Sequence, residues 1–147
     1  MGQQQLLLIV LGVIIVGIAI AVGISMFKSN AQSSNRDQVI NDLNNLAAKA
    51  QQFYRKPTAM AGGGQSFTGF ALAPIDTGNG NGSYSVQSEG SAPSGATYVA
   101  GSITAATASV DSVFITGCGI ELGNDGTHQV KAYVTVKNNT ITAQVLN

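Results

Sequence analysis

Apolar and polar positions divide the first third of this 147-residue chain into two stretches with different patterns. The first stretch, from Leu6 to Phe27, contains no charged residue and no proline. At about 1.5 Å per residue, a helix of this length spans about 33 Å, which matches the roughly 30 Å of a bilayer core. It lacks the basic start of a secretory signal and is longer than the apolar core of one. We therefore interpret residues 1–27 as a retained hydrophobic helix that forms a membrane anchor or a filament core.

The second stretch, residues 28–56, predicts an amphipathic helix. Its apolar residues recur at helical spacing between polar ones; they are Val39, Ile40, Leu43, Leu46, Ala47, Ala50, Phe53 and Tyr54. Pro57 ends the pattern, and two basic residues before it suit the negative end of the helix dipole. Residues 28–35 are rich in Ser and Asn, which favour helix caps and turns. Two alternatives follow: a helix that continues through a soft hinge, or a new helix capped near residues 33–35. No Gly or Pro interrupts this part, so we expect continuity.

Residues 57–147 predict glycine-rich loops and short strands. Thr58–Gly69 is a glycine-rich loop, which we expect Phe67 and Phe70 to anchor to the core. No Lys-Ser/Thr pair follows its glycines, so the pattern is not that of a phosphate-binding loop. The run Asp76–Gly82 has the composition of a turn.

Strand patterns occupy the rest of the chain, at Ser83–Gln87, Ala96–Ile103 and Val110–Cys118. Gln129–Leu146 predicts a β-hairpin that turns at Asn138-Asn139. One face of the hairpin is apolar, and we expect it to pack on the stripe of the amphipathic helix; its residues are Val130, Ala132, Val134, Val136, Ile141, Ala143 and Val145. The predicted fold class is α+β, with a long N-terminal helix packed on a small antiparallel sheet.

Charge and reactive side chains exclude several functions. Seven Lys+Arg balance seven Asp+Glu, so there is no basic footprint for nucleic acid. The single cysteine, Cys118, lies in an apolar run and is interpreted as a small buried side chain. His128 is interpreted as an exposed loop residue. No residues suggest a catalytic site or a cofactor, and Glu121 and Asp125 are too few for a calcium loop, so a plain turn is the preferred interpretation near Asp125.

This plan, an apolar helix that continues into an amphipathic half carrying a small sheet, resembles the type IV pilin superfamily, which includes the type II secretion pseudopilins. In that family a prepilin peptidase removes a short leader, and a glutamate stands at the fifth mature position before the apolar run. If Met1 is the first mature residue, Gln5 occupies that position and Leu6 opens the run in register. Cleavage after Gly2 would instead place Leu7 there, so we expect Met1 as the mature start.

The chain departs from the family pattern at three points. Gln5 replaces the glutamate, so the family's ion pair to a neighbour's amino group becomes a hydrogen bond at most. Val22 stands where a proline is frequent, and one cysteine cannot form a C-terminal disulfide loop. Three glycines in the apolar helix, Gly12, Gly17 and Gly23, could loosen the helix or let helices approach closely.

The resemblance implies a structural subunit of a type IV pilus-like extracellular filament, with no enzymatic activity, that polymerises with copies of itself. Its partners would be the prepilin peptidase, the pilus assembly machinery and, before assembly, the inner membrane. Lys28 alone would place the end of the apolar run in the cytoplasm, whereas the resemblance implies the opposite orientation. Met1 and Gln5 are expected to form the N-terminal contact, and the filament core is expected to contain Leu6, Leu7, Ile9, Val10, Val13, Ile14, Val16, Ile18 and Ile20. Two alternatives are a type II secretion pseudopilin and a single-span anchored binding module that does not polymerise.

Overall fold

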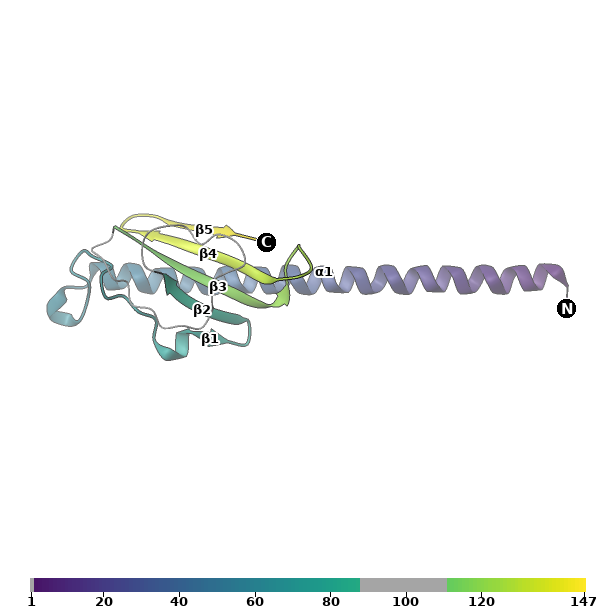
Figure 1. The fold of residues 1–147 in the computed structure, drawn as a ribbon, viewed down its shortest axis with the longest axis horizontal. Coiled ribbons are helices and arrows are strands. Elements are labelled where there is room, and N and C mark those ends of the chain that lie inside the picture. Colours follow the sequence, from purple (N-terminus) through teal and green to yellow (C-terminus); the bar gives the residue numbers. More distant parts are fainter. Residues whose placement is uncertain (1, 88–110) are drawn as a thin grey trace.

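The computed structural model describes residues 2–87 and 111–147, and within them one long helix carries a five-stranded head on its C-terminal half (Figure 1). Met1 and the strand expected at Ala96–Ile103 lie outside the described residues. The arrangement is α+β, which confirms the predicted fold class. In chain order the elements are α1 (Gln3–Arg55), the 3-10 helices η1 (Thr58–Met60) and η2 (Pro74–Asp76), and the strands β1 (Gly78–Asn79), β2 (Gly82–Gln87), β3 (Ser112–Leu122), β4 (Gln129–Lys137) and β5 (Ile141–Val145).

Helix α1 is continuous over 53 residues, so the expected continuity through residues 28–35 is confirmed. Its end is set by Pro57. Lys56, the residue before this proline, has φ −76° and ψ 132° and is therefore extended, because the proline ring disfavours the helical conformation of its predecessor. The chain then leaves the helix axis and enters the glycine-rich loop.

All neighbouring strands pair antiparallel, in the order β1-β2-β3-β4-β5. The predicted hairpin is confirmed: β4 and β5 pair from Ala132↔Val145 to Val136↔Ile141, with the turn at Asn138-Asn139. Strand β3 runs four residues beyond Cys118, where the prediction ended, through a register shift between Cys118 and Leu122. The expected turn at residues 76–82 also contains the short edge strand β1.

The core lies between the apolar stripe of α1 and one face of the sheet. Val39, Leu43, Ala47 and Ala50 are fully buried. They meet the strand residues Tyr84, Val86, Val113, Ile115, Ala132, Val134 and Val136. Gly117 brings helix and sheet close together, because a Cβ atom there would lie 3.0 Å from side-chain atoms of Val39 and Tyr84. The predicted packing of β4 on the stripe of α1 is therefore confirmed.

The predicted burial of β5 is wrong. Ile141 and Val145 are 39% and 42% exposed, and Ala143 is exposed as well. These residues stand opposite the buried positions of β4 and so share their face of the sheet. Helix α1 lies mainly under β3 and β4, however, and makes few contacts with β5. Within the described residues, the single helix is too narrow to cover every strand, and the apolar face of β5 is left exposed.

The glycine-rich loop folds back onto the end of α1. The N–H groups of Gly63 and Gln65 donate to carbonyl oxygens in the last turn of the helix, each at 2.8 Å, and the Gly64 N–H donates to the carbonyl of Lys56, the residue after the helix, at 2.9 Å. These bonds satisfy carbonyl groups that a helix C-terminus otherwise leaves unpaired. At Gly63 a Cβ atom would collide with the Ser66 carbonyl, so the close fold requires glycine.

Two aromatic pairs hold this loop on the helix, as expected for Phe67 and Phe70. Phe67 is fully buried and its ring lies 4.8 Å from that of Tyr54, while the rings of Phe70 and Phe53 are 5.5 Å apart. Both separations suit favourable aromatic pairs. The loop therefore belongs to the hydrophobic core of the head.

Candidate assembly interface

The N-terminal half of α1 projects from the head (Figure 1). Its residues 3–30, which are all exposed and which we call the rod, carry the apolar run. The large apolar side chains of the rod are between 48% exposed at Leu11 and 76% exposed at Phe27. By length and composition alone, α1 is the one helix among the described residues that could cross a membrane. Contiguous apolar surface of this extent is rare on monomeric soluble proteins and marks a membrane or protein contact. The structure leaves this surface available to a partner or a membrane.

All the residues expected in the filament core lie on this rod, and each is exposed. Gln5 lies in the first turn of α1 and is also exposed, while Met1 is outside the described residues. The structure therefore brings the core residues onto one element but does not place them in contact with a second element. Their assembly role remains a prediction.

The three glycines of the rod lie within unbroken helix. A Cβ atom added at Gly12, Gly17 or Gly23 would meet no atom within 4 Å, so nothing in the single chain requires glycine at these positions. At 3.6 residues per turn, Gly12, Ala19 and Gly23 fall within a narrow sector of the helix surface. Small residues in one sector let a neighbouring helix approach closely. The expectation that the three glycines loosen the helix stays a prediction.

Asn35 fixes the point at which the free rod becomes part of the head. Its side chain is buried, with Nδ2 donating to the Asn81 carbonyl at 2.9 Å and Oδ1 accepting from the Glu121 N–H at 3.3 Å. A Cβ atom at Gly119 would collide with this side chain. One turn earlier, Gln32 Nε2 donates to Asn124 Oδ1 at 3.2 Å. The Ser- and Asn-rich stretch is therefore the clamp between rod and head.

Asp42 joins α1 to the β1–β2 turn. Its Oδ2 accepts from Asn79 Nδ2 at 2.8 Å, Asn81 Nδ2 at 3.0 Å and the Tyr84 hydroxyl at 2.7 Å. Burial acts to raise the pKa of Asp42, but the three hydrogen bonds together outweigh it and lower the pKa below its ordinary value. Burial and the bond to Asp42 raise the pKa of Tyr84. The charged carboxylate is thus the form that the folded head prefers.

We expect Asp42 to make the stability of the head depend on acid pH. Since its pKa is lower in the folded head, its contribution is complete above about pH 4 and is lost as the pH falls through the folded pKa. Asp42→Asn should cost about 1–3 kcal/mol at pH 7 and flatten this acid dependence. Urea unfolding of the fragment from Asn30 onward between pH 2 and pH 7 measures both effects. Parallel acid slopes for the two proteins would contradict the assignment.

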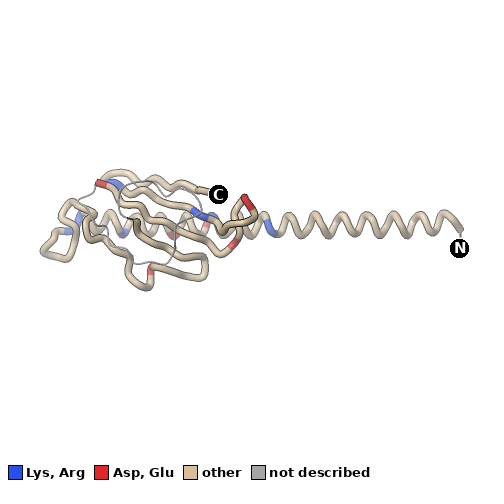
Figure 2. Tube along the Cα trace, in the orientation of Figure 1, with Lys and Arg blue, Asp and Glu red and all other residues tan. Residues whose placement is uncertain are grey.

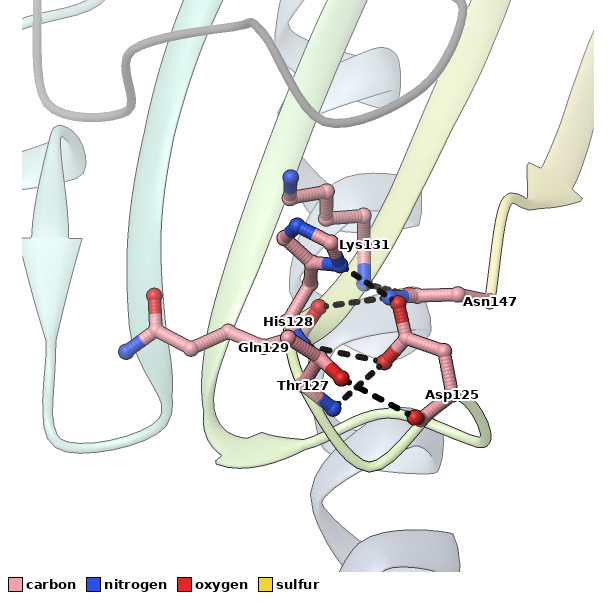
Figure 3. A network of polar contacts seen from close by, with 6 residues as sticks. All are labelled: Asp125, Thr127, His128, Gln129, Lys131 and Asn147. Atoms are coloured by element: carbon pink, nitrogen blue, oxygen red, sulfur yellow. Dashed lines mark hydrogen bonds and ion pairs between the residues drawn. The ribbon is translucent and has the colours of Figure 1, made fainter.

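The β3–β4 turn is stabilised by Asp125 (Figure 3). Its Oδ1 accepts from the N–H groups of Thr127 and His128, at 3.0 and 2.9 Å, and its Oδ2 lies 2.6 Å from His128 Nδ1. The backbone bond from His128, followed by its side-chain bond, holds the pKa of Asp125 well below its usual range. His128 is exposed as expected, but the sequence did not reveal its pairing with Asp125.

The start of β4, directly after this turn, is bonded to Asn147 at the end of the described chain. Asn147 Oδ1 accepts from the Lys131 N–H at 2.7 Å, and Asn147 Nδ2 donates to the Gln129 carbonyl at 3.0 Å (Figure 3). Arg36 Nη2 donates to the Asn147 carbonyl at 3.2 Å. These bonds attach the segment after β5 to β4 and to α1 without a disulfide.

Cys118 is 8% exposed on β3, which confirms its interpretation as a small buried side chain. Its Sγ donates to Gln129 Oε1 at 3.2 Å. Burial raises the pKa of the thiol, and the charge of Lys131 only partly opposes this shift. The thiol is therefore protonated and weakly reactive near neutral pH.

Within residues 2–87 and 111–147, no group of three or more His, Cys, Asp or Glu side chains gathers in a metal-binding set. Comparisons with protein-family models, with curated proteins and with solved structures gave no match. The function is therefore argued from the residues and geometry of this chain.

Proposed function

We propose that this chain is the structural subunit of a type IV pilus-like extracellular filament, held in the inner membrane before assembly. One observation carries the proposal: a continuous apolar rod, exposed along its whole length, extends from a folded polar head. In a filament, the rods of many copies would bury this surface against one another, at about 25 cal/mol per Å² of apolar area. In a membrane, the same rod would span the hydrocarbon core.

The head can stay folded in the same way whether the rod lies in the membrane or in a filament. The core of the head is complete without the rod, because its buried apolar residues begin at Val39. A subunit can therefore leave the membrane and enter a fibre without refolding its head. The sector that contains Gly12, Ala19 and Gly23 favours close helix packing over an isolated anchor.

Shear preparations from cells that produce the full chain test the proposal. We expect long fibres in negative-stain images, with this chain as their main band by mass spectrometry. Short periplasmic assemblies without surface fibres would instead favour a secretion pseudopilin. A membrane-bound monomer alone would favour an anchored binding module.

Gln5 provides a second test, because the pilin resemblance implies a contact between this position and the amino group of a neighbour. A hydrogen bond to a charged partner contributes about 1.5–3 kcal/mol. Gln5→Leu should therefore lower the fibre yield without destabilising the head, and Gln5→Glu should preserve or raise the yield. Fibre yield relative to membrane-held subunit is the measurement. A wild-type yield from Gln5→Leu would show that Gln5 is only a polar end to the apolar helix.

A further inference from the structure

Acidic positions lie in and beside the β3–β4 turn, where the free rod begins, and basic positions lie near the end of α1 (Figure 2). The proximal end, where the free rod begins, is formed by the β3–β4 turn, which Gln32 attaches to α1. The distal end lies where α1 stops at Arg55. We call residues 120–128 the proximal lip and the hollow at the end of α1 the distal hollow.

The proximal lip is acidic and partly apolar. It contains Glu121 and Asp125 but no Lys or Arg, although Lys28 lies on the adjoining rod. Ile120 and Leu122 are 59% and 52% exposed. The Asp125 carboxylate is engaged within the turn, whereas the exposed Glu121 carboxylate has no bond within the described residues. Glu121 and its two apolar neighbours are thus available to a partner.

The distal hollow has the complementary character. It has a volume of about 500 Å³, and its apolar lining includes Phe53 and the exposed Ala61, Ala71 and Ala73. Phe70 and Leu72 also line it but are only 5% and 3% exposed. Lys49 and Lys56 also line it. Lys49 binds Asp76 at 2.7 Å, whereas the exposed Lys56 has no ion pair within the part of the chain that the structure describes. Among the described residues, the hollow therefore offers a cation without an ion pair beside an apolar surface.

We infer that the proximal lip of one subunit docks in the distal hollow of a second copy, with Glu121 facing Lys56 and with Ile120 and Leu122 on the apolar wall. This inference rests on the proposed filament function. The charges are opposite, and both surfaces combine a free charge with exposed or cavity-lining apolar groups. Complementary charge across an interface fixes register and excludes wrong partners.

The geometry of the two surfaces explains why the contact would build a fibre. They lie at opposite ends of one head, so the contact joins two different surfaces and each added copy presents a new lip and a new hollow. Between Gln32 and Lys56 the helix is about 36 Å long. Successive heads in one row should therefore be related by an axial shift of about this length.

Charge reversal in the full chain tests the inference. Glu121→Lys and Lys56→Glu should each raise the concentration required for filament growth about five- to tenfold, because each places like charges together in every contact. An equal mixture of the two variants should recover assembly, since every lip then finds a hollow of opposite charge. The double variant should recover it alone. Asp37→Lys, a reversal at an exposed helix position outside both surfaces, is the matched control and should assemble like wild type.

The outcomes separate this inference from the proposed function. If the wild-type chain forms no filaments, the proposed function and the docking contact are both wrong. If the wild type assembles but the reversals have no effect, or if mixing does not restore growth, the docking contact alone is overturned. Circular dichroism of each variant establishes that its head is folded, and Glu121→Cys with Lys56→Cys, oxidised in filaments, should give a ladder of covalent oligomers.

Discussion

A single aspartate at Val16 is expected to abolish filament formation while leaving the head folded. Val16 is 58% exposed in the single chain, at the middle of the apolar rod. In a packed fibre its position would be buried, and an unpaired buried carboxylate costs several kcal/mol in every subunit. We expect fibre yield to fall at least about 100-fold, because each 1.4 kcal/mol is a factor of ten.

The matched control is Gln38→Asp, which introduces the same charge on the exposed side of α1 within the head. It should assemble like wild type. Yield is measured by shearing and quantitative blotting against the membrane-held subunit, with the two variants at equal expression. Abundant fibres from Val16→Asp would contradict the packed-rod filament.

The second large effect is on the head itself. Leu43 is fully buried at the centre of the contact between α1 and the sheet. Leu43→Ala removes its buried methyl groups and leaves a cavity, which should lower the free energy of unfolding by about 2–5 kcal/mol. For a small domain this is a large share of the total stability. The adjacent Asn44→Ala, at an exposed position, should change it by less than about 0.5 kcal/mol.

Urea unfolding of the fragment from Asn30 onward measures both changes. This fragment keeps Gln32, the first helix residue that is bonded to the head by its side chain within the described part, and the whole buried core. If Leu43→Ala and Asn44→Ala unfold at the same urea concentration, the assigned core is wrong. Full-length Leu43→Ala should also produce fewer fibres, since an unfolded head exposes the subunit to degradation.

The parts of the fold that depend on local pattern could be predicted from the amino-acid sequence. The absence of charge from Leu6 to Phe27, helical periodicity up to Tyr54 and the stop at Pro57 were enough to define α1. Alternation on both sides of Asn138-Asn139 was enough to define the hairpin of β4 and β5. These signals are reliable because helix and strand each repeat over a few neighbouring residues.

Which apolar surfaces are covered could not be predicted from local pattern and depends on how the elements pack. Alternation placed Ile141 and Val145 on the same face as Val134, but the course of α1 beneath β3 and β4 left β5 open. A period along the chain identifies the apolar face of a strand, yet it does not indicate how far a single helix extends across the sheet.

Hydrogen bonds between residues far apart in the chain could not be predicted from the sequence either. Asn35 belongs to a stretch with turn-like composition, yet it is buried and joins α1 to Asn81 and Glu121. Asp42 lies among the polar residues between the apolar positions of the helix, and nothing in that pattern indicates the three hydrogen bonds that it accepts from β1, β2 and the turn between them. Local periodicity was enough to predict the helix, the hairpin and the apolar rod. The contacts of Gln32 and Asn35 that join rod and head arise only in the folded chain, because they connect residues dozens of positions apart. Folding also places the acidic proximal lip and the Lys56-lined distal hollow at opposite ends of the head.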